Sequence, residues 1–135
     1  MIRGLNHITF AVTDLARSFA FYVEALGCRP VARWSNGAYL TAGGVWLALV
    51  VEDDVNPTGR TDYSHIAFAC APDDFAAMSE RLRAAGADTW QPNRTEGDSF
   101  YFTDPDGHRL ELHVGDLDSR LTHMRSHPWG NIEFF

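Results

Sequence analysis

The sequence predicts an α+β fold made of two copies of one βαβββ module. An alternating strand pattern followed by an amphipathic helix occurs near the start of the chain and returns from about residue 63. A tight-turn sequence, Asp104-Pro105-Asp106-Gly107, separates the last two expected strands. A chain of 135 residues is normally one domain. We therefore expect a single domain of two modules, about 4–51 and 62–115, with a C-terminal tail over 116–135.

The first module is expected to contain one helix among four strands. Leu5–Val12 alternates between apolar and polar residues, which is typical of a half-buried strand. Thr13-Asp14 can cap the helix that follows, whose apolar stripe continues until Gly27 ends it. Turn signals then delimit the other three strands. These strands are Val31–Ser35, Tyr39–Thr41 and Val45–Val51, with the turn signals at Asn36-Gly37 and Gly43-Gly44.

The second module repeats this order after the polar stretch Glu52–Asp62, which we interpret as a linker. A strand over Tyr63–Cys70 precedes a helix whose apolar stripe begins at Phe75 and which ends at Gly86. His7 and His65 occupy the same place in the first strands of the two copies.

The last two strands, Ser99–Thr103 and His108–Val114, should form a hairpin with two unlike faces. One face is apolar and carries Phe100, Phe102, Leu110 and Leu112. The other is polar and carries Ser99, Tyr101, Thr103, Arg109, Glu111 and His113. An exposed edge hairpin would also have this pattern. Because Glu111 lies mid-strand and two earlier strands carry a lone histidine at a comparable depth, we expect the polar face to line a cavity. Glu111 also takes the place that Ala48 has in the first module.

Composition narrows the classes of function. The net charge is −7 and the chain has no basic run, which makes nucleic acid a poor partner. Cys28 and Cys70 sit among apolar neighbours, as expected of buried thiols in a cytosolic protein and not of a disulfide framework. No apolar stretch approaches the length of a signal peptide or a membrane span. The expected location is the cytoplasm.

His7, His65 and Glu111 form the candidate metal site. A single strand histidine is more often a hydrogen-bonded or surface residue than a ligand. Two histidines and one carboxylate at internally equivalent positions, however, supply three ligands and leave coordination sites open for a substrate. This ligand set suits Mn, Fe, Co, Ni or Zn. We expect His108 in the tight turn, and His123 and His127 in the tail, to face solvent.

Beyond the paired modules, six segments carry a resemblance to a known family. The chain resembles the vicinal oxygen chelate superfamily and, within it, the FosA-type fosfomycin-resistance glutathione transferases. The segments are Gly4–His7, Ala32–Trp34, Gly37–Leu40, Asp62–His65, Asn93–Phe102 and Asp104–Glu111. The resemblance implies a domain-swapped homodimer in which His7 of one subunit joins His65 and Glu111 of the other around Mn(II). It also implies that glutathione opens the epoxide of fosfomycin.

The resemblance also implies residue roles. Thr9 would bond near the oxirane oxygen and Tyr39 would lie beside the thiol. Substrate contacts would come from Trp46, Tyr63, Thr95, Tyr101 and Arg120. A monovalent cation, K⁺, would take oxygens from Asn93, Thr95, Glu96, Gly97 and Ser99. Without the resemblance, a surface ion pair for Arg120 with Asp116 or Asp118, a strand role for Tyr39 and a core role for Trp46 would be favoured.

One departure bears on the substrate, because Gln91 stands where the family has a Lys that helps to bind phosphonate. Three other functions therefore remain open. A metal-dependent epoxide hydrolase would need a carboxylate base, and Gly43, Gly44 and Ala48 offer none. Isomerase or dioxygenase chemistry would ordinarily use a different ligand set. A drug-sequestering protein would generally lack the metal ligands, so metal content separates it from the others.

Overall fold

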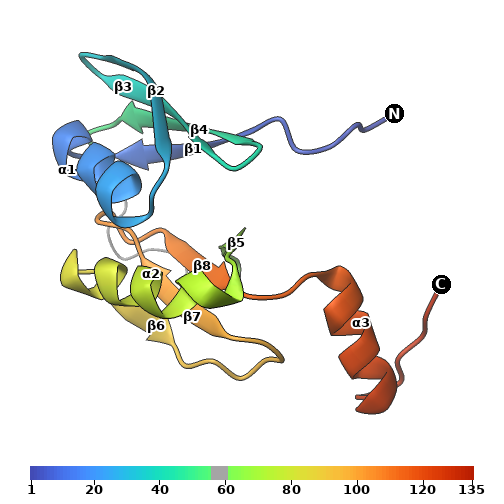
Figure 1. Cartoon of the computed structure of the whole chain (residues 1–135). Helices are drawn as coiled ribbons and strands as arrows, with labels where there is room; N and C mark the ends of the chain where they lie inside the picture. Colours follow the sequence, from blue (N-terminus) through green and yellow to red (C-terminus); the bar gives the residue numbers. More distant parts are fainter. Residues whose placement is uncertain (56–60) are drawn as a thin grey trace.

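The structure is a computed structural model that describes residues 1–55 and 61–135. The first module has four strands, a short helix and a π-helical turn: β1 (His7–Val12), α1 (Leu15–Ala20), η1 (Phe21–Ala25), β2 (Arg29–Trp34), β3 (Gly37–Ala42) and β4 (Val45–Val51). The second module has the same order: β5 (Ile66–Ala69), α2 (Pro72–Ala84), β6 (Thr89–Gln91), β7 (Ser99–Thr103) and β8 (Arg109–His113). A last helix, α3 (Leu117–Ser126), stands apart from both sheets in Figure 1.

The two sheets have the same topology, which confirms the predicted α+β fold of paired βαβββ modules. Their strand orders are β1-β4-β3-β2 and β5-β8-β7-β6, and in each the first strand is parallel to the last. The registers are equivalent as well. Thr9 is paired with Ala48 in one sheet, and Ala67 with Glu111 in the other. The internal alignment made from the sequence, in which Glu111 takes the place of Ala48, is therefore confirmed.

Several element boundaries differ from those predicted. The first strands are shorter than the apolar alternation suggested, so that β5 begins at Ile66 and His65 lies just before it. The tail contains a helix, because Asp116 and Ser119 form a reciprocal capping box at the start of α3. No residue of α3 is buried. Its apolar pattern was too weak to indicate a helix from sequence.

The core lies between the sheets and the helices, and it uses one face of each sheet. Helix α1 packs against β3 and β4, and α2 packs against β8. Figure 1 shows α1 and α2 on the same side of the molecule. The predicted apolar hairpin face is buried here, including Phe102 and Leu110. The opposite face of the first sheet is exposed, with Tyr39 38% and Trp46 36% accessible.

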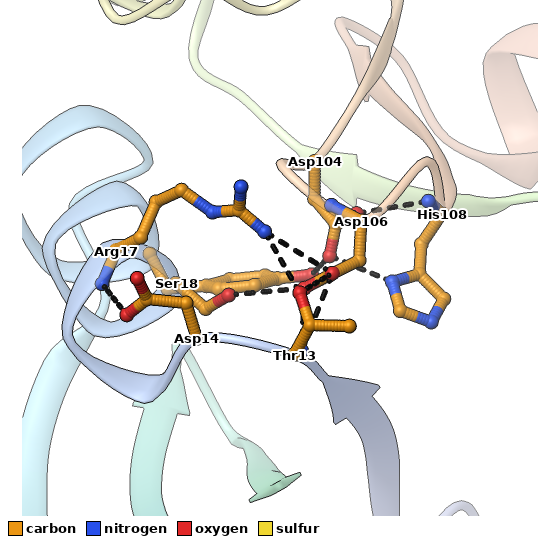
Figure 2. A network of polar contacts seen from close by, with 8 residues as sticks. Thr13, Asp14, Arg17, Ser18, Asp104, Asp106 and His108 are labelled. Carbon is orange, nitrogen blue, oxygen red and sulfur yellow. Dashed lines mark hydrogen bonds and ion pairs between the residues drawn. The ribbon is translucent and has the colours of Figure 1, made fainter. Parts of the chain in front are cut away.

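The β7–β8 turn ties the second module to the first (Figure 2). The hydroxyl of Thr13 donates to Oδ1 of Asp106 at 2.6 Å, and Arg17 pairs with the same oxygen at 3.2 Å. The hydroxyl of Tyr22 donates to Oδ2 of Asp104 at 2.8 Å. Both carboxylates are buried, so these bonds replace the hydration that they lose on folding.

The prediction that His108 faces solvent is wrong. Its side chain is half-buried, and Nδ1 lies 2.7 Å from Oδ2 of Asp104. By contrast, His123 and His127 are exposed as predicted, and their rings stack at 4.6 Å. Burial lowers the pKa of His108. The hydrogen bond to Asp104 and the charge of Asp104 together raise the pKa by more than burial lowers it, so that the net pKa is above its usual value.

Other expectations from the sequence have mixed outcomes. Cys28 is buried, with a pKa raised to about 11 by burial, whereas Cys70 is only partly buried; both are free thiols. The ends of the predicted linker Glu52–Asp62 have no strand or helix, and its residues 56–60 lie outside the described part of the chain. Among the described residues, no helix is long and apolar enough to cross a membrane.

Candidate metal and substrate site

His65 and Glu111 meet at the uncovered face of the second sheet. Nδ1 of His65 lies 2.7 Å from the backbone carbonyl oxygen of Tyr63, which can only accept, so Nδ1 carries a hydrogen. In a neutral ring the lone pair is then on Nε2, which lies 2.8 Å from Oε2 of Glu111. Two atoms with lone pairs can lie this close only when they share a proton or a metal ion. Two ligands about 2.1 Å from one metal at a right angle lie about 3 Å apart, so this pair fits a metal.

The other oxygen of Glu111 is already engaged. The hydroxyl of Ser99 donates to Oε1 at 2.6 Å, and the residue is only 6% exposed. Strand pairing fixes this arrangement, because Tyr101 and Ala67 flank Glu111 on the two neighbouring strands. Oε2 is therefore the oxygen of Glu111 that is available beside His65.

His7 lies on the uncovered face of the other sheet. Nδ1 is 2.7 Å from Oδ1 of Asn6, so that Nε2 carries the lone pair, as in His65. Within residues 1–55 and 61–135, no group of three or more histidine, cysteine, aspartate or glutamate side chains could hold a metal. One chain therefore brings together two of the three predicted ligands, His65 and Glu111, and leaves His7 apart.

Aromatic side chains surround His65. The rings of Tyr63, Trp90 and Tyr101 lie 4.9, 5.5 and 5.7 Å from the His65 ring. The hydroxyls of Tyr63 and Tyr101 are 3.5 Å apart. Burial and the Tyr63 hydroxyl raise the pKa of Tyr101, and they outweigh the lowering effect of Thr95. Tyr101 therefore remains a protonated donor at neutral pH.

The face around His7 is aromatic as well. Trp46 lies 4.6 Å from the His7 ring and 5.0 Å from the Tyr39 ring. Thr9 and Tyr39 are both paired with Ala48, one on each side, so they share a row across the sheet with a methyl group between them. The small Ala48 side chain between them is itself buried, with 4% of its surface exposed.

The loop before β7 folds on itself through Asn93. Its Oδ1 accepts from the backbone and the hydroxyl of Thr95 at 3.0 and 3.2 Å, and its amide donates to the carbonyl oxygen of Gly97 at 2.9 Å. Oε2 of Glu96 is buried with no hydrogen-bond donor among the described residues. Nε of Arg120 is 3.5 Å from it, a long ion pair. Arg120 thus pairs with Glu96 and not with Asp116 or Asp118.

The paired modules are those of a known superfamily. The family model described as the Glyoxalase/Bleomycin resistance protein/Dioxygenase superfamily matches residues 4–112. The chain belongs to this superfamily. The match includes seven strands and all of β8 except its last residue, His113, and it ends one residue after Glu111.

Within the superfamily, the chain is similar to proteins of fosfomycin resistance. It is 47% identical to glutathione transferase FosA of Serratia marcescens, covering 99% of this chain and 96% of that one. It is 41% identical to metallothiol transferase FosB of Shouchella clausii, covering 91% and 88%. A FosX variant of Listeria monocytogenes, complexed with Mn(II) and 1S,2S-dihydroxypropylphosphonic acid, aligns with a TM-score of 0.80 at 33% identity over 91% of this chain and 98% of that one.

Two side chains at this site were given no role by the sequence reasoning. Trp90 packs on His65 and Tyr101, and its indole donates to the carbonyl oxygen of Leu110 at 3.1 Å. His113 lies beside Ser99, with Nδ1 2.7 Å from the hydroxyl. A signal existed for His113, which shares the polar hairpin face with Glu111. For Trp90 no signal existed, because the short strand β6 was not predicted.

Proposed function

We propose that this chain is a metal-dependent glutathione transferase that opens the epoxide of fosfomycin. The observation that carries the proposal is the pair formed by His65 and Glu111, two acceptor atoms 2.8 Å apart at the uncovered face of a sheet. The similarity to glutathione transferase FosA of Serratia marcescens over nearly the whole chain supports the choice of substrates.

His7, His65 and Glu111 would hold the metal, with His7 coming from a second chain. The Mn(II) complex of the FosX relative supports manganese as the ion. Bound there, the metal would polarise the epoxide oxygen and offset the negative charge that develops on it. The two histidines have matching hydrogen bonds at Nδ1, which orient both Nε2 atoms outward.

In the proposed reaction, the sulfur of glutathione attacks an epoxide carbon as the thiol loses its proton. A C–S bond forms, the C–O bond breaks, and the oxygen keeps the electron pair and gains a proton. Thr9 donates a hydrogen bond to this oxygen, and Tyr39 lies beside the sulfur. Thr9 and Tyr39 lie on the two strands that flank Ala48, and both are paired with it. This arrangement supports the two roles, because one hydroxyl can contact the epoxide oxygen while the other contacts the sulfur.

Three side chains would bind the phosphonate. Tyr101 is a protonated donor, Thr95 interacts with it, and Arg120 supplies the positive charge. Trp46 and Tyr63 would pack around the small carbon skeleton. Arg120 is held against Glu96 in the absence of an anion, so binding of the phosphonate would exchange one negative partner for another.

A potassium ion would bind in the loop before β7. Its proposed ligands are oxygens of Asn93, Thr95, Glu96, Gly97 and Ser99. Oε2 of Glu96 is buried, accepts no hydrogen bond among the described residues and has only the long ion pair with Arg120; this supports a cation here, since a buried carboxylate oxygen without a hydrogen bond is costly. The ion would also stabilise a nearby phosphonate.

The proposed assembly is a domain-swapped homodimer. The sheet faces that carry His7 and His65 are both left uncovered by the helices of their own chain. If the first sheet of one chain covered the second sheet of another, two exposed aromatic surfaces would be buried and the three ligands would meet. The same contact would build two identical sites.

An epoxide hydrolase is the alternative that a specific observation favours. The FosX relative was crystallised with a dihydroxypropylphosphonic acid, which is the product expected when water opens the epoxide. In the described residues, however, the uncovered face of β3 and β4 offers no carboxylate base; it carries Tyr39, Thr41, Trp46, Ala48 and Val50. The transferase is therefore preferred.

Product analysis tests the proposal. The purified protein is incubated with fosfomycin and Mn(II), with and without glutathione, and the phosphorus-containing products are followed by NMR and mass spectrometry. The expected result is a glutathione adduct that forms only with both Mn(II) and the thiol. A diol formed at the same rate without thiol would establish the hydrolase. Binding of the drug with no turnover and no metal content would establish a sequestering protein.

A further inference from the structure

We propose that His113 is a positioning residue that fixes the carboxylate of Glu111 by acting through the hydroxyl of Ser99. The proposal rests on the metal role of Glu111 given above. It assigns a task to a histidine that is neither a predicted ligand nor a predicted substrate contact. Three observations support the proposal. They are a series of hydrogen bonds from His113 to Glu111, the close packing of the His113 ring against two glycines, and the different partners of the two Glu111 oxygens.

The hydrogen-bonded chain has a defined direction. Oγ of Ser99 lies 2.6 Å from Oε1 of Glu111 and 2.7 Å from Nδ1 of His113. A serine hydroxyl has one proton, and a carboxylate oxygen can only accept, so Ser99 donates to Glu111. Ser99 must then accept from Nδ1–H of His113, and this contact is much shorter than the 3.3 Å between Nδ1 and Oε1 of Glu111 itself. The two residues face each other directly in the β7–β8 ladder, which keeps this contact short.

The ring of His113 packs against the backbone of two glycines, Gly97 and Gly115. A Cβ at Gly115 would lie 3.0 Å from Nε2 of His113, and a Cβ at Gly97 would lie 3.3 Å from Cε1. Both glycines have positive φ, +134° and +80°, a region that other residues rarely adopt. The side chain of His113 is 15% exposed. Because backbone is close on two sides, the ring has little freedom to turn its Nδ1 away from Ser99.

As a consequence, the two oxygens of Glu111 have different partners. Oε1 is held by Ser99, and Oε2 is directed at Nε2 of His65. Without this restraint the carboxylate could rotate and exchange its oxygens, and part of the metal-binding free energy would be spent on ordering it. His113 therefore preorganises Glu111 to bind the metal through a single oxygen.

The test measures Mn(II) affinity, without fosfomycin or glutathione, by competition with a chelating dye. Loss of an outer hydrogen-bond partner of a ligand typically costs about 10- to 100-fold in metal affinity, and His113→Ala should show a loss in this range. His113→Asn is the conservative rescue, because its amide nitrogen can occupy the place of Nδ1. His113→Gln is the matched control, because its amide lies one bond further out. Asn should keep most of the affinity and Gln should not.

A double-mutant cycle isolates the path through Ser99. Ser99→Ala should weaken binding about as much as His113→Ala, and the double variant should be little worse than either, because one chain of bonds is broken in all three. A potassium-free buffer keeps the proposed cation site from contributing. Thermal unfolding of each variant separates loss of folding from loss of affinity.

The outcomes distinguish this proposal from the proposed function. If Glu111→Gln weakens Mn(II) binding and His113→Ala does not, the metal site stands and the positioning role is refuted. Additive effects of Ser99→Ala and His113→Ala would also refute it, since His113 would then act by another route. If Glu111→Gln itself leaves the affinity unchanged, the metal assignment fails first.

Discussion

Glu111 stands where the first module has Ala48, so the central rows of the two sheets differ in charge and size. In the first sheet the central row holds the methyl group of Ala48 between Thr9 and Tyr39. In the second sheet the same row holds a buried carboxylate between Ala67 and Tyr101. The same strand pattern therefore presents a carboxylate in one half and a methyl group in the other.

Glu111→Gln should abolish most of the Mn(II) affinity of the purified protein. A neutral amide replaces an anionic ligand, and the loss should exceed the roughly 10- to 100-fold that follows removal of an outer hydrogen-bond partner. Metal content after dialysis measures it. Occupancy equal to that of the wild type in this variant would exclude Glu111 as a ligand.

Gln91→Lys should raise kcat/KM for fosfomycin with glutathione. Gln91 is half-buried and is paired with Tyr101, in the same row of the sheet as Glu111. A charge-assisted contact to the phosphonate is worth about 1.5–3 kcal/mol, and the lower end is expected because the Lys side chain must be ordered. Steady-state kinetics should show roughly a tenfold gain that shrinks as salt is added.

An uncharged epoxide is the control for Gln91→Lys, since it lacks the anion that the new charge would attract. An equal gain with that substrate, or none with fosfomycin, would mean that residue 91 does not face the phosphonate.

At the scale of elements, the β7–β8 turn joins the two modules. The Asp-Pro-Asp-Gly signal is local, so the sequence predicted the turn, and Gly107 donates its backbone N–H to the carbonyl oxygen of Asp104 at 3.0 Å. Burial of Asp104 and Asp106 was not predictable, because their partners Thr13 and Tyr22 are more than eighty residues away in sequence. His108 was wrongly expected to face solvent because its ring packs 5.1 Å from that of Phe10, which is also distant in the sequence.

The turn should give the protein a pH-dependent stability. The folded pKa of His108 is raised, so its contribution is fully present below the unfolded value of about 6.5 and is lost as pH rises through the folded pKa. Urea unfolding of the wild type and of His108→Gln measures this. The difference in free energy of unfolding should be largest near about pH 5.5 and should shrink above neutrality. A difference that does not vary with pH would refute the coupling.

At the scale of the whole molecule, the sequence predicted the strands and their faces better than the position of the two sheets relative to each other. Period-two alternation identified the faces that carry His7, His65 and Glu111, because it depends only on the pleat. The position of one sheet relative to the other is set by contacts between modules, which no local pattern records. The expectation that all three side chains point into one cleft is therefore met only in part within a single chain, where His65 and Glu111 meet and His7 does not.

Mixing two inactive variants tests whether the site is shared between chains. His7→Ala and Glu111→Ala are unfolded together in equal amounts, refolded, and assayed for the glutathione adduct of fosfomycin. Random pairing makes about half of the dimers mixed, and one of the two sites in each mixed dimer keeps all three ligands, so about a quarter of wild-type activity should return. No recovery, in a sample in which differently tagged chains demonstrate mixed dimers, would contradict a site built from two chains.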